Sequence, residues 1–208
     1  MLTAVRLGIL GGTFDPPHIA HLYVGEVAYR QLGLDQVLFM PSGVPWQKLG
    51  RSVSTSDHRL RMTELSITGM PHFAVDDRET HREGWTYTAD TLATFDISDE
   101  VVLILGADAA VNLPTWQRAD EVLSRAKIAV APRPGVDIDR VAGALGSFET
   151  LDTVEIGISG TMLRERAATG RPIRFLVAEP VWSYIEELDL YRGPSPTVEA
   201  TVDQEENP

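Results

Sequence analysis

Short apolar runs alternate with longer helical patterns along most of this chain. Runs bounded by glycine or proline predict buried strands, and apolar positions at helical spacing predict helices. The expected strands are residues 5–10, 36–40, 72–75, 101–105, 127–131 and 153–158, and the expected helices are residues 19–32, 56–68, 88–95, 137–145, 160–169 and 180–188. This alternation predicts an α/β fold, a Rossmann-like doubly wound parallel sheet covered on both faces. Ligands of such sheets bind beyond the carboxyl ends of the strands.

The alternating pattern ends near residue 192, although the chain has 208 residues. Residues 1–192 are long enough for one domain with its own core. Residues 193–208 are rich in Pro, Ser, Thr and acidic side chains without apolar periodicity, which predicts a disordered acidic tail. No run is long enough to span a membrane, and no signal peptide opens the sequence. The chain has no cysteine, which excludes disulfides and fits a cytoplasmic protein.

The formal net charge of −12 bears on which classes of molecule the protein can bind. A general nucleic-acid binder would need a basic face, so that class is disfavoured. If the substrates are anions, the site has to gather positive charge locally against the field of the whole protein. The sequence should therefore show where such charge comes from.

The first candidate site begins where the strand at residues 5–10 ends. Gly11 and Gly12 allow the backbone to approach a ligand closely, and the prolines that follow make a rigid turn. His18 and His21 then fall on one face at the start of the helix at residues 19–32. A helix N-terminus favours an anion such as phosphate. This segment therefore predicts a phosphate site with two imidazoles beside it.

A dinucleotide fingerprint, a P-loop and a zinc site all fit this segment less well. The glycines do not form G-x-G-x-x-G and no G-K-[ST] follows, so neither of the two nucleotide-binding motifs is present. The two histidines could suggest zinc, but the chain has no cysteine and no third ligand nearby. The simplest alternative is that the histidines only cap a surface helix. That role would account for one histidine, but not for the glycines, the prolines and the second histidine of the segment.

A second candidate anion site lies near the other end of the chain, in the segment ISGTMLR at residues 158–164. Ser159 or Thr161 can cap the helix that starts there, and the N–H groups of that helix favour an anion. Arg164 adds a permanent forked cation that suits phosphate. By itself this pattern is weakly specific.

At these residues the chain resembles a known family. GGTFDPPHIAH at residues 11–21 resembles the G-G-T-F-D-P-x-H-x-G-H signature of nucleotidyltransferases, in the form found in bacterial nicotinate-nucleotide adenylyltransferases. Ala20 stands where that motif usually has Gly. The segment at residues 158–164 resembles the family's I-S-S-T-x-I-R, with Gly160 for the second Ser and Leu163 for the Ile. The resemblance covers the chain to about Arg192 and implies the nucleotidyltransferase type of the Rossmann-like fold.

The resemblance also implies a set of site residues. Its catalytic residues would be His18, His21, Lys48 and Arg164. Its ATP-binding residues would be Gly11, Gly12, Thr13, Phe14, His18, His21, Gly106, Asp108, Ser159, Thr161 and Arg164. Its substrate-binding residues would be Asp15, Ser42, Trp46, Thr88, Trp116 and Arg133.

Several of these assignments have a simpler alternative. Lys48 by itself would be a solvated loop lysine, and Trp116 by itself would be a core residue. In the family the backbone N–H at Thr88 meets the pyridine carboxylate and the indole at Trp116 stacks on the ring. Ser42 and Trp46 replace a usual Asn and Pro, and we hypothesise that Trp46 acts as a lid.

The implied activity is the transfer of the adenylyl group of ATP to nicotinate mononucleotide in NAD biosynthesis, with Mg²⁺ arriving on ATP and no metal site in the protein itself. No nucleic-acid or membrane partner is expected, and a homo-oligomer is possible. The alternatives are nicotinamide mononucleotide or phosphopantetheine as the acceptor, or a non-catalytic nucleotide-binding protein. The phosphopantetheine family usually has T-x-x-H where His18 and His21 stand.

Overall fold

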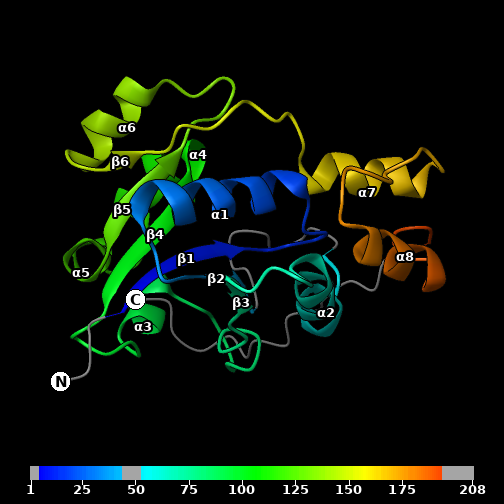
Figure 1. The fold of residues 1–208 in the computed structure, drawn as a ribbon, viewed down its shortest axis with the longest axis horizontal. Coiled ribbons are helices and arrows are strands. Elements are labelled where there is room, and N and C mark those ends of the chain that lie inside the picture. Colours follow the sequence, from blue (N-terminus) through cyan, green and yellow to red (C-terminus); the bar gives the residue numbers. More distant parts are fainter. Residues whose placement is uncertain (1–4, 44–52, 194–208) are drawn as a thin grey trace.

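The computed structural model describes residues 5–43 and 53–193, which form a parallel sheet covered by helices (Figure 1). The strands are β1 (Arg6–Gly12), β2 (Gln36–Pro41), β3 (Phe73–Val75), β4 (Glu100–Gly106), β5 (Lys127–Ala131) and β6 (Glu149–Thr150). Their order is β3-β2-β1-β4-β5-β6, and every neighbouring pair is parallel. The chain starts near the middle of the sheet and winds outward in both directions, which confirms the predicted doubly wound α/β fold.

Two apolar clusters cover the two faces of the sheet. On one face α1 (Ile19–Leu32) packs through Ala28 and Leu32 against strand residues that include Leu10. The cluster on the other face includes Ile9 and the buried residues of four helices. These helices are α3 (Thr88–Leu92), α4 (Ala107–Asn112), α5 (Ala119–Arg125) and α6 (Ile138–Leu145). Because neighbouring strand residues point to opposite faces, adjacent Ile9 and Leu10 fall in different clusters.

A third apolar cluster joins helices that are far apart in sequence. It contains Met62 of α2 (Ser56–Ser66), Leu163 of α7 (Gly160–Ala168) and Val181 of α8 (Glu179–Glu187), all fully buried. Figure 1 shows these three helices together at one end of the molecule, beyond the end of β1. The cluster therefore brings the segment after β2 and the C-terminal part of the described chain to the edge of the sheet where a ligand is expected.

The predicted strand at residues 153–158 is wrong. The last strand among the described residues is β6, and residues 153–158 run in irregular backbone beside a cavity. Val154 is 65% exposed, so the apolar residues of this segment do not mark a strand buried in the sheet. Sequence reasoning also missed α4 and α5 and extended α3 to residue 95, because helices this short carry little periodic signal.

The ends of the chain add two findings. The predicted tail at residues 193–208 lies outside the described residues apart from Gly193, so its disorder stays a prediction. Within residues 5–43 and 53–193, no helix is long and apolar enough to cross a bilayer.

Candidate active site

Two adjoining cavities lie where the carboxyl ends of the central strands meet the helices. The large cavity has a volume of about 670 Å³ and the small cavity about 240 Å³. Residues 11–13, at the end of β1 and just after it, line both. A Cβ added at Gly11 would meet no protein atom within 4 Å, so this shared wall leaves room for a ligand to touch the backbone.

The large cavity brings together residues from both ends of the chain. Every residue predicted to bind ATP lines it, although Phe14 and Arg164 are 150 positions apart in sequence. The residues concerned are Gly11, Gly12, Thr13, Phe14, His18, His21, Gly106, Asp108, Ser159, Thr161 and Arg164. The two motifs therefore line one cavity, and ATP binding by these residues stays a prediction.

The two histidines are held against each other at the start of α1. Their rings are stacked with centroids 3.7 Å apart, and the rings of Phe14 and His21 are nearly perpendicular with centroids 5.0 Å apart. The backbone N–H of His18 donates to Nδ1 of His21 at 3.2 Å. Because this Nδ1 is an acceptor, the neutral His21 ring carries its hydrogen on Nε2. The N–H of Ile19, expected to face an anion, instead donates to the carbonyl of Leu176 at 3.1 Å.

Burial controls the charge of His18. Its side chain is 2% exposed, and burial, assisted by the Arg133 guanidinium, lowers the pKa of His18 to about 4. At neutral pH the ring is therefore uncharged, and it offers an N–H donor without a formal charge. Its Nδ1 is buried and has no hydrogen-bond partner among the described residues.

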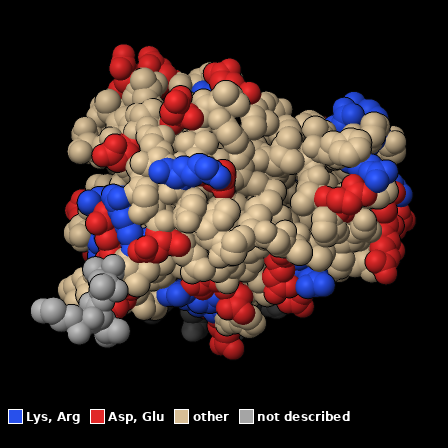
Figure 2. All heavy atoms as spheres, viewed as in Figure 1, with Lys and Arg blue, Asp and Glu red and all other residues tan. Residues whose placement is uncertain are grey.

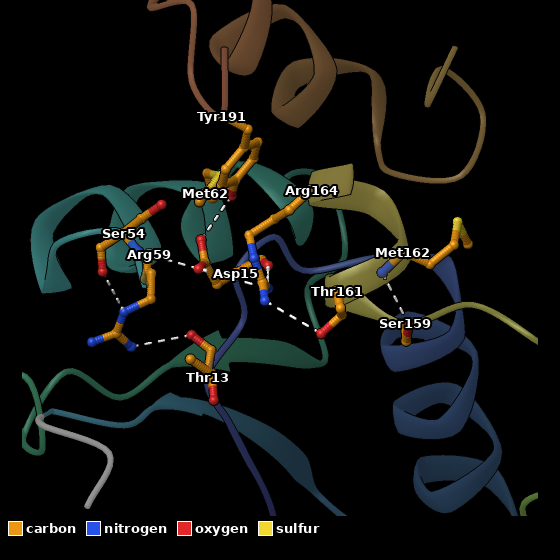
Figure 3. A network of polar contacts seen from close by, with 10 residues as sticks. All are labelled: Thr13, Asp15, Ser54, Arg59, Met62, Ser159, Thr161, Met162, Arg164 and Tyr191. Carbon is orange, nitrogen blue, oxygen red and sulfur yellow. Dashed lines mark hydrogen bonds and ion pairs between the residues drawn. The ribbon is translucent and has the colours of Figure 1, made fainter. Parts of the chain in front are cut away.

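Arg164 supplies a permanent positive charge in the wall of the large cavity. Its Nη1 donates to the backbone oxygen of Asp15 at 2.7 Å, and its Nη2 donates to Oγ1 of Thr161 at 3.3 Å (Figure 3). Ser159 caps α7 by accepting the N–H of Met162 at 3.3 Å. The guanidinium is thus oriented by the first motif and by its own helix before any ligand binds.

Asp15, predicted to contact substrate, is occupied by protein groups. It lines the large cavity but is 3% exposed. One carboxylate oxygen accepts the hydroxyl of Tyr191 at 2.8 Å, and the other accepts the N–H of Ser54 at 3.1 Å (Figure 3). Its observed partners make Asp15 a junction between the first motif, the start of α2 and the C-terminal turn.

Arg133 also faces the large cavity. Its Nε lies 3.5 Å from Oδ1 of Asp108, and both side chains are about half exposed. Asp108 therefore partly offsets the charge of Arg133, which reaches the cavity as one member of an ion pair. The substrate contact predicted for Arg133 stays a prediction.

The small cavity contains the remaining predicted substrate residues that the structure describes. Ser42, Thr88 and Trp116 line it, and Thr88 is the first residue of α3, as expected for a backbone donor. Trp116 also packs partly against the core, so it is both a core residue and a cavity wall. Trp46 and Lys48 lie outside the described residues, so the predicted lid and phosphate contact stay predictions.

Sequence reasoning missed an acidic residue in the small cavity. Glu79 lines it, and its Oε1 accepts the hydroxyl of Thr91 at 2.7 Å. Burial is the largest influence on this carboxyl and raises the pKa of Glu79. The run DDRE at residues 76–79 looks like a solvated turn, but its position after the carboxyl end of β3 was a usable signal.

In the view of Figure 2, acidic side chains lie mainly along the margins of the face that α1 covers. The large cavity is lined by Arg133 and Arg164 as well as by Asp15 and Asp108, so positive charge is gathered there within a chain of net charge −12. Among residues 5–43 and 53–193, no group of three or more acidic or histidine side chains could hold a metal ion.

Comparison with known proteins agrees with this geometry. A family model described as cytidylyltransferase-like matches residues 9–166. A probable nicotinate-nucleotide adenylyltransferase of Thermoanaerobacter sp. (strain X514) is 40% identical over 90% of this chain and 95% of its own length. A probable nicotinate-nucleotide adenylyltransferase of Thermomicrobium roseum is 41% identical over 95% of this chain and 94% of its own length.

A solved structure has the same fold at low sequence identity. The nicotinic acid mononucleotide adenylyltransferase of Plasmodium falciparum, solved in complex with NaAD, gives a TM-score of 0.76 at 18% identity over 90% of this chain and 97% of that one. At this identity the likeness supports the fold, while the family rests on the sequence matches. The chain belongs to the cytidylyltransferase-like family and, within it, to the nicotinate-nucleotide adenylyltransferases.

Proposed function

We propose that this protein transfers the adenylyl group of ATP to nicotinate mononucleotide, giving nicotinate adenine dinucleotide and pyrophosphate. The observation that carries the proposal is the pair of adjoining cavities with residues 11–13 in common. The large cavity, with its histidines and Arg164, suits the polyphosphate of ATP. The small cavity, with Thr88 and Trp116, suits a flat acidic ring. The names of the relatives support the same pair of substrates.

The chemistry needs no protein nucleophile. A phosphate oxygen of the mononucleotide attacks the α-phosphorus of ATP in line, and a new P–O bond forms. The bond from the α-phosphorus to the oxygen bridging to the β-phosphorus breaks, and pyrophosphate leaves with that electron pair. Catalysis then consists of positioning the two substrates and stabilising charge on the α-phosphate and the leaving group.

The residues of the large cavity divide this work. His18 and His21 donate N–H groups to the phosphates, and Arg164 holds the β and γ groups together with Lys48. Mg²⁺ arrives on ATP and supplies further charge neutralisation, with phosphate oxygens and water as its ligands. This fits the described residues, where Asp15 is already bonded to protein groups and Asp108 is paired with Arg133.

The small cavity selects the acceptor. The indole of Trp116 stacks on the pyridine ring and the N–H of Thr88 meets its carboxylate. Nicotinamide mononucleotide is the second candidate acceptor, because the Glu79 carboxyl in this cavity is a hydrogen-bond acceptor that an amide could use. The expected cytoplasmic location and the possible homo-oligomer remain predictions.

The deciding assay is pyrophosphate release with ATP and Mg²⁺, comparing nicotinate mononucleotide, its amide and phosphopantetheine. We expect the highest kcat/KM with nicotinate mononucleotide. A higher kcat/KM with the amide or with phosphopantetheine would reassign the acceptor. No release with any acceptor, in a protein that still binds ATP, would indicate a non-catalytic nucleotide-binding protein.

A further inference from the structure

A buried arginine lies beneath both cavities without lining either. Arg59 of α2 is 2% exposed, which is rare for a charged side chain. Its guanidinium donates four hydrogen bonds to backbone carbonyls. Nη1 donates to the oxygen of Thr13 at 3.1 Å, and Nε donates to the oxygen of Ser54 at 3.1 Å (Figure 3). Nη1 also donates to the oxygen of Ser42 at 2.6 Å, and Nη2 donates to the oxygen of Gly43 at 2.8 Å.

The carbonyls that Arg59 binds belong to the walls of the site. Thr13 lines both cavities, and Ser42, which follows β2, lines the small one. The backbone N–H of Ser42 also donates to the oxygen of Gly12 at 2.9 Å, so the two segments are already neighbours. The guanidinium therefore fixes the wall common to both cavities against one wall of the small cavity.

Only a planar fork can make this set of bonds. Lysine would keep the charge, but its ammonium is a compact centre with three donors and cannot span four carbonyls in the same arrangement. The negative charge of Asp15 nearby stabilises the buried cation and opposes the effect of burial, which lowers the pKa of Arg59. Burying a charge is costly unless it is hydrogen-bonded, and the four carbonyls offset that cost for Arg59.

We propose that Arg59 is a positioning residue for adenylyl transfer, and that it sets the distance between the two bound substrates through the backbone of Thr13 and Ser42. The inference rests on the proposed function, because it assumes that one substrate occupies each cavity. Each cavity keeps its own contacts when Arg59 is changed, so binding of each substrate should survive. What should be lost is the alignment of the attacking oxygen with the α-phosphorus.

The test is steady-state kinetics of Arg59→Lys and Arg59→Gly. We expect kcat to fall by about a hundredfold, the scale that a displacement of about 1 Å of a reacting group costs. The KM values for ATP and for nicotinate mononucleotide should each change by less than about threefold, since uniform binding is retained. Millimolar guanidinium should restore much of the kcat of Arg59→Gly, whereas ammonium should not.

Ser66→Ala is the matched control on the same helix. Ser66 is 2% exposed and its hydroxyl donates to the oxygen of Thr63 at 2.7 Å, so this variant also loses a buried hydrogen bond but one that reaches no cavity. It should keep the wild-type kcat and show no response to guanidinium. Assays are run at a temperature at which circular dichroism shows each variant folded.

Three results would overturn the inference. The first is a wild-type kcat in Arg59→Lys, and the second is a rise in either KM with kcat unchanged. The third is failure of both Arg59 variants to fold at any temperature, which would assign Arg59 to folding alone. Wild-type protein that releases no pyrophosphate would refute the proposed function itself, so the two failures are distinguishable.

Discussion

The two cavities have residues 11–13 in common but differ in how the rest of their walls is made. The large cavity takes its chemistry from two compact motifs, one around His18 and one around Arg164. The small cavity is assembled from single residues on separate segments, such as Ser42, Glu79 and Trp116. In the large cavity, recognition of the polyphosphate depends on donors fixed at the first turns of helices. In the small cavity, recognition of the pyridine ring depends on how separate loops pack together.

This difference predicts that changes in the two cavities affect different kinetic constants. His18→Ala should lower kcat by about a hundredfold or more, the usual cost of removing one donor to developing charge. His72→Ala is the control, because His72 pairs with Glu26 at 2.7 Å and lines neither cavity. A near-normal kcat in His18→Ala, measured by pyrophosphate release, would remove His18 from the catalytic set.

Burial shifts a titration in each cavity, and the two shifts have opposite consequences for stability. The pKa of His18 is about 4 in the folded protein and 6.5 in the unfolded chain. Between these two pH values His18 is protonated in the unfolded chain and neutral in the folded protein. Acidification from pH 6.5 to about 4 should therefore cost about 3 kcal/mol of unfolding free energy through this group. Glu79 has a raised pKa, so its contribution is present at low pH and is lost as pH rises through that pKa.

Denaturant unfolding across this pH range tests both signs. His18→Gln should lose less stability on acidification than the wild type does. Glu79→Gln should gain relative to the wild type as the pH rises above the usual range of a glutamate. Parallel pH profiles for the wild type and either variant would show that the group concerned does not titrate as its burial indicates.

Trp116→Ala tests whether the small cavity binds nicotinate mononucleotide. It should raise the KM for nicotinate mononucleotide by about tenfold through lost stacking and burial, with little change in the KM for ATP. Trp182→Ala is the matched control, since Trp182 lies on α8 and stacks with Arg174 away from both cavities. Equal rises in both KM values would mean that Trp116 acts through the fold instead.

The smallest expected effect concerns Gly160, where the family motif usually has serine. A Cβ at Gly160 would lie 2.8 Å from the backbone oxygen of Asp15 and 3.3 Å from Nη1 of Arg164. Gly160→Ser should therefore raise the KM for ATP by about fivefold, since overpacking costs about 1 kcal/mol here. Gly143→Ser, with no atom within 4 Å of the added Cβ, should have no effect. A lower KM in Gly160→Ser would show that the serine hydroxyl outweighs the crowding.

The sequence predicted the large cavity better than the small one for a physical reason. A glycine pair, a rigid turn and a helix start lie next to each other in sequence, so the site around His18 is local and can be read directly. Glu79 and Arg59 owe their roles to packing between distant segments, which leaves no periodic or motif signal. The wrong strand at residues 153–158 has the same origin, because apolar residues facing a cavity resemble those facing a core.

The contacts that tie the first motif to the last turn have a consequence for synthesis. Leu176 accepts the N–H of Ile19, and Tyr191 donates to Oδ1 of Asp15, so two polar groups early in the described chain are bonded to residues near its far end. During synthesis on the ribosome, His18 and His21 emerge early. The turn that holds them cannot form its hydrogen bonds to Leu176 and Tyr191 until residues 176–191 have emerged. A competent catalyst therefore forms after release of nearly the whole domain, and shortened translation products lack it.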